Sequence, residues 1–450
     1  MNYRFQKVSS YIKHYGFKKL FRKAVERHSY KDSYNERRSE DIITNEEIDR
    51  QKNVKFSYNP VISILVPAFN TPHKAFFETL MSVKNQTYSN WELCVADAGE
   101  YSVKAVLDEV FGGDNRIKYV VLGDNRGIAA NTNEALRLAT GEYVAFLDHD
   151  DILEPDALFE IVTRISDKRA QMIYTDEDKV SENLDNYFRP YRKPDYNKML
   201  LLSNNYICHF CVIDKAIVDK TGGFRSEYDG AQDYDLFLRC IEHTERVEHV
   251  PKVLYHWRVS TQSTSDNPFN KKYAYDAGKR AIEDYLLRNG FSDDFAVKET
   301  DDPGYFRIVY TGEITFKDKY ELVISDSMKI SDGWEKIMQG VILLTGADIV
   351  VPKIIKKNRY VYNGLAQNGA GYTQSLKGKP AWYRGKFNLG ITAMEINKAP
   401  AKGILVKKSR MNNVIAVEKG YISNVEGVCN GIKMVYIPDV VINLKGKADE

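Results

Sequence analysis

The chain has 450 residues, a length that accommodates two or three domains. Apolar residues make up 43% of it and charged residues 28%, as is usual for a soluble globular protein. The formal net charge of +2 at pH 7 argues against a general nucleic-acid binder, because such proteins carry a strongly basic surface.

The five cysteines are scattered through the chain. Their odd number and their apolar surroundings favour free thiols in a reducing compartment over a disulfide framework. The segment Cys208-His209-Phe210-Cys211 is a single CxxC, and a zinc site would need a second pair, so we interpret these cysteines as buried thiols. We expect no signal peptide and no membrane-spanning helix, because no apolar run is long enough.

We predict that residues 1–57 form a basic amphipathic helix followed by a polar linker that contains a short helix. Residues 1–40 hold eleven Lys and Arg against four Asp and Glu. Apolar side chains recur between them at helical spacing, a pattern typical of helices that lie on anionic membrane surfaces. The same pattern also suits a helix that packs its apolar face on the main domain.

From Pro60 onward, short apolar runs alternate with amphipathic segments. We predict strands at 61–67, 91–97, 117–122 and 143–147, and helices around 76–83, at 103–111, from 125 onward and after Pro155. Strands that alternate with helices predict a mostly parallel, Rossmann-like sheet with right-handed crossovers.

The stretch GEYVAFLDHDDILEPD, residues 141–156, carries the strongest chemical signal. Its apolar run is followed at once by Asp148, His149, Asp150 and Asp151, which places the carboxylates at the C-terminal end of a strand, where open α/β sheets bind ligands. Neighbouring carboxylates repel one another, and Mg²⁺ or Mn²⁺ relieves that repulsion. Acidic residues before a helix can also simply cap it.

Several motifs in a fixed order resemble glycosyltransferase family 2, the inverting GT-A enzymes. They are ISILVPAFN, WELCVADAG, NRGIAANTNEALRLATGEYVAFLDHDD, YTDEDK, GAQDYDL and HVPKVLYHWR. The resemblance covers about residues 58–290 and is strongest to a subgroup that builds bacterial surface polysaccharides and includes rhamnosyltransferases. It implies that an acceptor hydroxyl attacks the anomeric carbon of a nucleotide-sugar with inversion.

The resemblance also implies a metal site. Asp148 and Asp150 would form the DxD motif, with Asp150 as the better ligand of Mn²⁺ or Mg²⁺ and Asp148 nearer the ribose or a metal-bound water. His256 would complete the metal site, although a core histidine is the alternative. Asp151 is expected to cap the following helix.

Asp233 occupies the position of the family's general base. The helical spacing of the residues that follow places it near a helix start, where we expect the helix dipole to lower its pKa and keep it ionised. A helix-capping role is the alternative, and Asp235 is expected to face elsewhere.

The residues expected to bind the nucleotide-sugar are Pro67, Ala68, Phe69, Asp97, Arg126, Asp148 and Arg258. Asp97 ends its strand where the family contacts the nucleotide base, but Ala98 stands where the family commonly has a second acid, which leaves the nucleotide open. Arg126 could hold the diphosphate or the ribose, or simply be solvated. Arg258 lies on the same strand as His256 with the same side-chain direction.

Residues 300–450 contain short echoes of the preceding domain. Residues 320–326 resemble 91–97, residues 435–441 resemble 248–254, and residue 346 begins a segment like the acceptor half without DHDD. We hypothesise a smaller C-terminal α/β domain that is a degenerate second GT-A-like unit.

The sequence therefore predicts a GT-A domain at 58–295 between the N-terminal segment and a domain at 300–450. The predicted activity is metal-dependent transfer from a UDP- or dTDP-sugar, such as dTDP-rhamnose, to a glycan or lipid-linked glycan. We expect a cytoplasmic protein, peripheral at the inner face of a bacterial membrane, with partner glycosyltransferases and no nucleic acid. The alternative is a non-catalytic glycan-binding or scaffold subunit. A nicotinamide enzyme is excluded because GxGxxG is absent.

Overall fold

The computed structural model describes residues 42–259 and 272–356, and then 360–361, 376, 378–383, 390, 392–396, 398–411, 421–423 and 432–444. The predicted N-terminal basic helix lies outside these residues. Among the helices that are described, none has the length and apolar character needed to cross a membrane.

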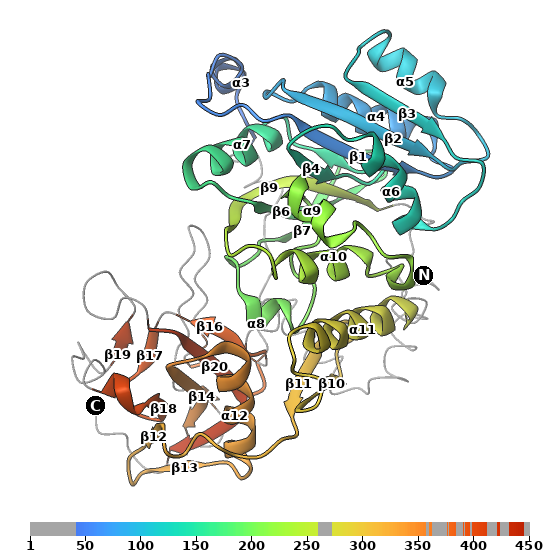
Figure 1. Cartoon of the computed structure of the whole chain (residues 1–450). Coiled ribbons are helices and arrows are strands. Elements are labelled where there is room, and N and C mark those ends of the chain that lie inside the picture. Colours follow the sequence, from blue (N-terminus) through green and yellow to red (C-terminus); the bar gives the residue numbers. More distant parts are fainter. Residues whose placement is uncertain are drawn as a thin grey trace, which may run out of the picture. The chain divides into compact units, whose positions relative to one another are not determined.

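The first lobe is built on a nine-stranded sheet with helices on both faces (Figure 1). Its strands are β1 (Ile62–Ala68), β2 (Trp91–Asp97), β3 (Ile117–Val121), β4 (Tyr143–Phe146), β5 (Ile152–Leu153), β6 (Met172–Ser181), β7 (Tyr187–Tyr191), β8 (Cys211–Asp214) and β9 (Val247–Val259). They run in the order β3-β2-β1-β4-β8-β6-β9-β5, with β7 beside β6.

Two kinds of strand pairing divide this sheet. The pairs from β3 through β2 and β1 to β4 are parallel. Strand β8 then runs antiparallel to both β4 and β6, β6 and β9 are parallel, and β5 is antiparallel to β9. The first lobe is therefore the mostly parallel α/β domain that the alternation of apolar runs predicts.

The helices bury both faces of the sheet, which explains why its central strands are apolar on both sides. Helices α4 (His73–Lys84), α5 (Lys104–Phe111) and α7 (Ala157–Lys168) pack on one face, and α6 (Ile128–Leu138), α9 (Lys215–Thr221) and α10 (Gln232–Cys240) pack on the other. The remaining helices of this lobe are α3 (Asn45–Lys52), α8 (Lys198–Leu201) and α11 (Lys272–Arg288).

A second, smaller α/β lobe follows the hairpin of β10 (Phe295–Glu299) and β11 (Phe306–Tyr310), as predicted. Its strands are β12 (Tyr320–Val323), β13 (Met328–Ile330), β14 (Ile349–Lys356), β15 (Tyr360–Val361), β16 (Met394–Ile396), β18 (Ile404–Lys407) and β20 (Met434–Leu444). They form a seven-stranded sheet on which α12 (Trp334–Thr345) packs. The short strands β17 (Lys398–Pro400) and β19 (Tyr421–Ser423) pair separately.

The sheet order β12-β18-β14-β20-β13 contains a single parallel pair among its described strands, β14 with β20. Strands β14, β18 and β20 have several buried apolar side chains each, whereas β12 buries only Tyr320 and the side chains of β13 are partly or fully exposed. The buried side chains of this mixed sheet belong to a hydrophobic cluster that also includes residues of the first lobe.

Candidate active site

The carboxyl ends of three parallel strands meet at one edge of the first sheet. The pairing register places Ala68 at the end of β1 opposite Asp97 at the end of β2, and places Phe146 of β4 beside Leu65 of β1. Asp148 follows β4 directly, and its side chain is 42% exposed. The residues that were predicted on three separate strands thus come together at the edge where α/β sheets bind ligands.

The acidic cluster divides into an accessible and a buried part. Asp151 is fully buried, and its carboxylate accepts hydrogen bonds from the Tyr255 hydroxyl and, at 2.7 Å, from the backbone N–H of Arg258. The prediction that Asp151 caps the following helix is wrong, because α7 begins only at Ala157 and its N-cap residue is Asp156. Through these hydrogen bonds, Asp151 instead links the loop after β4 to strand β9.

Burial raises the pKa of Asp150, and the negative charge of Asp148 raises it further, whereas His149 and Arg258 oppose the shift. Burial and the charges of Asp150 and Asp148 also raise the pKa of Asp151 well above its ordinary value. Burial and the mutual repulsion of the carboxylates thus disfavour the charged forms of Asp150 and Asp151, and a bound cation would stabilise those forms.

Arg258 holds the main chain of this cluster. Its Nε donates to the carbonyl of Asp150 at 2.6 Å, and its Nη1 donates to Glu78 Oε2 at 2.6 Å and to the carbonyl of Glu182 at 2.7 Å. Its Nη2 is buried and has no hydrogen-bond partner within the described part of the chain. An unsatisfied guanidinium N–H beside the DHDD loop is a candidate donor to an anionic ligand.

His256 lies in a different environment from the one predicted. Its Nδ1 is 2.6 Å from Asp178 Oδ1 and its Nε2 is 2.8 Å from Glu154 Oε1. Burial would lower the pKa of the imidazole, but the two carboxylates outweigh that effect and raise it. Because both ring nitrogens already have partners, this geometry gives no support to His256 as a metal ligand, and that role stays a prediction.

Asp233 is the second residue of α10, as predicted. Its Oδ1 accepts the N–H of Tyr234 at 2.8 Å, and its Oδ2 accepts the side-chain amide of Asn205 at 2.8 Å. Burial raises its pKa, and this effect exceeds the opposing effects of His209 and the two hydrogen bonds. The prediction of a lowered pKa is therefore wrong in direction, since desolvation exceeds the effect of the helix start.

His209 is a residue of this site whose role the sequence did not indicate. Its Nε2 lies 3.9 Å from Asp148 Oδ2, and its ring packs against Tyr255, with 5.1 Å between centroids. Its charge also acts on Asp233. His209 therefore lies electrostatically between the DxD motif and the candidate base, although in the sequence it is only one of the two residues between Cys208 and Cys211. Both of those cysteines are free thiols.

The remaining predicted residues lie on the side of β1 and β2. Phe69 is 42% exposed just beyond β1, after Pro67 and Ala68. Asp97 is almost fully buried, and its carboxylate accepts from the backbone N–H groups of Gly99 and Val103. These bonds give Asp97 a structural role in the turn before α5, whether or not it also contacts a ligand.

Arg126 lies before α6 with its side chain 48% exposed. Its guanidinium donates to Glu134 at 2.6 Å and lies 3.6 Å from Asp124. The structure thus gives Arg126 two surface carboxylates as partners and does not bring it into the network around Asp148.

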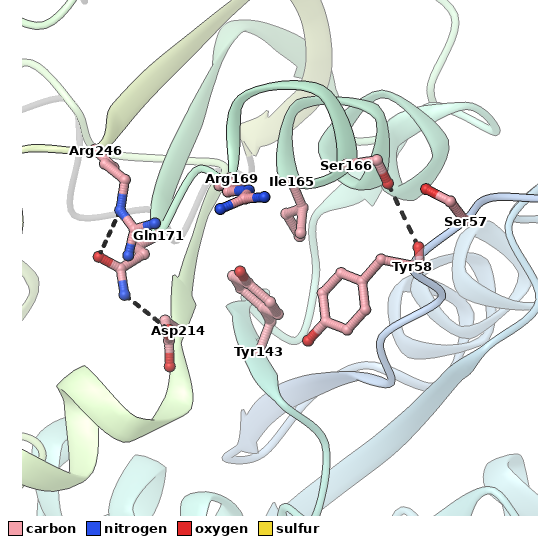
Figure 2. A pocket seen from close by; sticks show the side chains of 9 residues that line it. All are labelled: Ser57, Tyr58, Tyr143, Ile165, Ser166, Arg169, Gln171, Asp214 and Arg246. Carbon is pink, nitrogen blue, oxygen red and sulfur yellow. Dashed lines mark hydrogen bonds between the residues drawn. The ribbon is translucent and has the colours of Figure 1, made fainter.

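A cleft of about 390 Å³ lies away from this edge (Figure 2). Tyr143, the first residue of β4, and Asp214, the last residue of the antiparallel β8, both line it. The cleft is therefore at the opposite end of β4 from Asp148, and none of the predicted site residues lines it.

The carboxylates present fit a hard divalent cation only in part. Among the described residues, no three Asp, Glu, His or Cys side chains are grouped closely enough to hold a metal ion by themselves. Mg²⁺ is often bound by one or two carboxylates together with substrate phosphates and water. Asp148 and Asp150 fit that mode of binding, with the unpaired N–H of Arg258 available to the same phosphates.

The chain is similar to known glycosyltransferases. The profile of Glycosyl transferase family 2 matches residues 63–222. The colanic acid biosynthesis protein WcaA of Escherichia coli is 32% identical over 46% of this chain and 76% of its own length. WfgD of Escherichia coli, named as a UDP-Glc:alpha-D-GlcNAc-diphosphoundecaprenol beta-1,3-glucosyltransferase, is 28% identical over 51% of this chain and 89% of its own length.

Other relatives are much longer than the segment they share with this chain. The match spans between 19% and 30% of their length, and they include an O-antigen biosynthesis protein of Myxococcus xanthus. Among solved structures, TarS of S. aureus, crystallised with UDP, aligns at 19% identity with a TM-score of 0.41 over 50% of this chain and 65% of its own.

The mostly parallel sheet with its acidic loop after β4 is a GT-A fold, and the profile match and the relationship to WcaA show that this chain belongs to glycosyltransferase family 2.

Proposed function

We propose that the chain is a metal-dependent inverting glycosyltransferase that extends a bacterial cell-surface polysaccharide. The observation that carries this proposal is the group formed by Asp148, Asp150 and the unpaired Nη2 of Arg258 at the carboxyl edge of the sheet. It places two neighbouring carboxylates, of which burial disfavours the charged form of Asp150, beside a cationic donor, which suits a metal ion and a diphosphate bound side by side.

Asp148 and Asp150 would hold Mg²⁺ or Mn²⁺, and His256 would join them only if it released Asp178 or Glu154. The bound cation would stabilise the negative charge that develops on the leaving nucleoside diphosphate. Arg258 would donate Nη2–H to the same diphosphate, while its Nε keeps the backbone of Asp150 in place.

Asp233 would act as the general base. It accepts the proton of the acceptor hydroxyl as that oxygen forms a bond to the anomeric carbon and the bond from that carbon to the diphosphate oxygen breaks. Its raised pKa favours this role, because a carboxylate that burial makes more basic accepts a proton more readily. Asn205 and the N–H of Tyr234 fix its two oxygens.

The donor would be a UDP- or dTDP-sugar, with dTDP-rhamnose among the candidates. Pro67, Ala68 and Phe69 would line the nucleotide, and Asp97 would contact its base or, through its bonds to Gly99 and Val103, shape the loop beside it. WfgD is named for a UDP-sugar donor and a diphosphoundecaprenol-linked acceptor. By analogy, we propose a lipid-linked glycan acceptor at the cytoplasmic face of the membrane.

The experiment that tests this function is a calorimetric titration of UDP-, dTDP- and GDP-sugars into the full chain, with Mn²⁺ and with EDTA. We expect one nucleotide to bind with Mn²⁺ and to bind at least tenfold more weakly with EDTA and in Asp150→Ala. The matched control is Asp167→Ala, on the helix that follows the acidic loop, which should bind like the wild type. If no nucleotide binds, the non-catalytic glycan-binding or scaffold role becomes the better explanation.

A further inference from the structure

The second sheet repeats the strand order and the strand directions of part of the first. The first sheet contains β4-β8-β6-β9-β5, and the second contains β12-β18-β14-β20-β13. In both, the first two pairs are antiparallel, the third is parallel and the last is antiparallel. A short strand, β7 or β15, pairs antiparallel with the third strand of each series.

The spacing along the chain is also repeated. The first residues of β4, α7 and β6 recur 177 positions later as the first residues of β12, α12 and β14 (Tyr143 and Tyr320, Ala157 and Trp334, Met172 and Ile349). The helices α7 and α12 both have 12 residues. Two unrelated lobes would have no reason to share strand order and helix length together with the same spacing.

The register of the parallel pair shows the same correspondence. Met172 at the start of β6 is opposite Val247, and its counterpart Ile349 is opposite Met434. Both pairs shift register just after the fourth residue of the central strand, at Thr175 in the first lobe and at Pro352 in the second.

Single hydrogen bonds recur at matching positions. The hydroxyl of Tyr143 donates to the carbonyl of Ala170 at 3.0 Å, and the hydroxyl of Tyr320 donates to the carbonyl of Ala347 at 2.7 Å. Each tyrosine is the first residue of its strand, and each bond spans 27 residues.

Near these two tyrosines, the two lobes share a backbone hydrogen bond but differ in their side chains. Figure 2 shows Gln171 and Asp214 near Tyr143. The backbone N–H of Asp214 donates to the carbonyl of Gln171 at 2.8 Å, and the N–H of Lys407 donates to the carbonyl of Asp348 at 2.8 Å. Shared backbone geometry with different side chains is what a diverged copy would retain.

The chemical groups of the first lobe's metal motif are missing from the second lobe. The correspondence places Ser325 at the position of Asp148 and Ser327 at that of Asp150. The two serine hydroxyls lie 2.9 Å apart and hydrogen-bond to each other. Neutral hydroxyls provide no negative charge to hold a divalent cation, and Asp326 between them, at the position of His149, is the one carboxylate in this turn. Residues 325–328 thus keep a single acid where residues 148–151 have three.

Among the residues that the structure describes, the second lobe also has no counterparts of β1, β2 and β3. Strand β12 is at the edge of its sheet among the described strands, whereas β4 has β1 beside it. Residues 272–319 are all described and contain only α11 and the β10–β11 hairpin. The ends of β1 and β2 form part of the ligand-binding edge of the first lobe. The described part of the second lobe has no strands that could form the same edge.

We infer that the described elements between residues 319 and 444 are a second copy of those in residues 142–259 that has lost the donor site, so that the chain holds one metal ion and one nucleotide-sugar, at Asp148 and Asp150 alone. This inference goes beyond the proposed function, and its part about ligands rests on that function. It also changes one alignment, since residues 320–323 correspond to β4 and not to β2, which they resemble in sequence.

The stoichiometry of binding tests the ligand part. Mn²⁺ and the nucleotide identified in the calorimetric panel are titrated into the full chain and into Asp150→Ala and Ser327→Ala. We expect one nucleotide per chain in the wild type and in Ser327→Ala, and loss of saturable binding in Asp150→Ala. Two nucleotides per chain, or saturable binding that persists in Asp150→Ala and disappears in Ser327→Ala, would overturn the inference.

A disulfide cross-link tests the copied fold independently of any nucleotide. Lys329 on β13 is directly opposite Asn443 on β20, as Ile152 on β5 is opposite His256 on β9. Cysteines at opposite positions of an antiparallel pair are within the 4.4–6.8 Å that a disulfide requires. Lys329→Cys/Asn443→Cys should therefore form a disulfide under mild oxidation, detected by mass spectrometry.

The matched control is Lys329→Cys/Lys356→Cys. Strands β13 and β14 lie on either side of β20, so these positions are about 10 Å apart and should not cross-link. Failure of the 329–443 pair to cross-link would overturn the copied fold. A cross-linked chain that binds no nucleotide would leave the duplication standing and remove the proposed function.

Discussion

The carboxylate of Asp233 shows how local surroundings set the acidity of one group. Its place at the start of α10 and its bonds to Tyr234 and Asn205 all favour the ionised form. Burial acts in the opposite direction and is the larger effect, so the pKa is raised. The sequence could predict the helix start, but not the burial, which depends on residues distant along the chain.

The raised pKa of Asp233 predicts the acid side of the pH–rate profile. A general base must be ionised, so kcat/KM should fall as the pH decreases through a pKa above the ordinary aspartate value of about 3.9. Asp233→Asn should lower kcat about 100-fold or more and change donor affinity by less than about threefold. The measurement is kcat/KM against pH for both proteins.

The control for Asp233 is Asp229→Asn, since burial also raises the pKa of Asp229, which instead accepts the backbone N–H of Ala129. This variant should keep the acid limb of the wild type. An Asp233→Asn enzyme with the wild-type rate and an unchanged acid limb would show that another group takes the proton.

The contacts of His209 and Asp151 could not be predicted from the sequence. The motif DHDD predicted an acidic edge, and the structure places Asp148 and Asp150 there. The burial of Asp151 under Tyr255 and the approach of His209 to Asp148 depend on contacts across 104 and 61 positions of the chain. No periodicity or motif encodes such contacts, so the predictions at these residues were wrong or absent.

At the level of elements, α10 is held in place by a buried ion-pair network. The carboxylate of Asp235 is fully buried and forms ion pairs with Arg239, at 2.6 Å, and with Arg225, which also pairs with Asp284. Asp235 is two residues beyond Asp233, so this network fixes the helix that presents the candidate base. The expectation that Asp235 faces away from the site agrees with these contacts.

Asp235→Asn should destabilise the fold by about 3 kcal/mol, because it leaves two arginines without their buried anion. The measurement is the urea midpoint of unfolding. Asp219→Asn is the control, since its pair with Lys215 lies on the surface and its loss should cost less than about 1 kcal/mol. A variant that keeps wild-type stability but loses catalysis would instead favour Asp235 as the base.

The elements of the first lobe could be predicted because their apolar runs are bounded by glycine, proline and charge. Strands β1, β2 and β4 begin and end within one residue of the predicted ranges. The second lobe was harder, since strands as short as β12 and β13 have four and three residues and no clear alternation. Its copied pairing is visible only in the register of distant strands.

At the scale of the whole molecule, the sequence predicted two α/β lobes of unequal size, and the structure confirms both. The predicted echo of 248–254 in 435–441 agrees with the pairing of β9 and β20, but residues 320–326 were aligned with β2 and not with β4, because Ser325 and Ser327 replace the acids that identify the end of β4. The strand pairing of β12 matches that of β4, although the acidic side chains that make the motif recognisable are absent after β12.

The basic segment at residues 1–30 predicts how the whole molecule partitions between water and membrane. Lysines and arginines near an anionic surface contribute about 1 kcal/mol each, and aromatic side chains between them add burial in the lipid interface. The full chain should therefore sediment with vesicles that contain anionic lipid, and a variant lacking residues 1–30 should stay in the supernatant.

Neutral vesicles are the control and should retain neither protein, and salt should weaken the binding. The truncated variant must still bind nucleotide, which shows that the first lobe is folded. If it sediments as the full chain does, the segment has another role, and packing of its apolar face on the main domain becomes the better explanation.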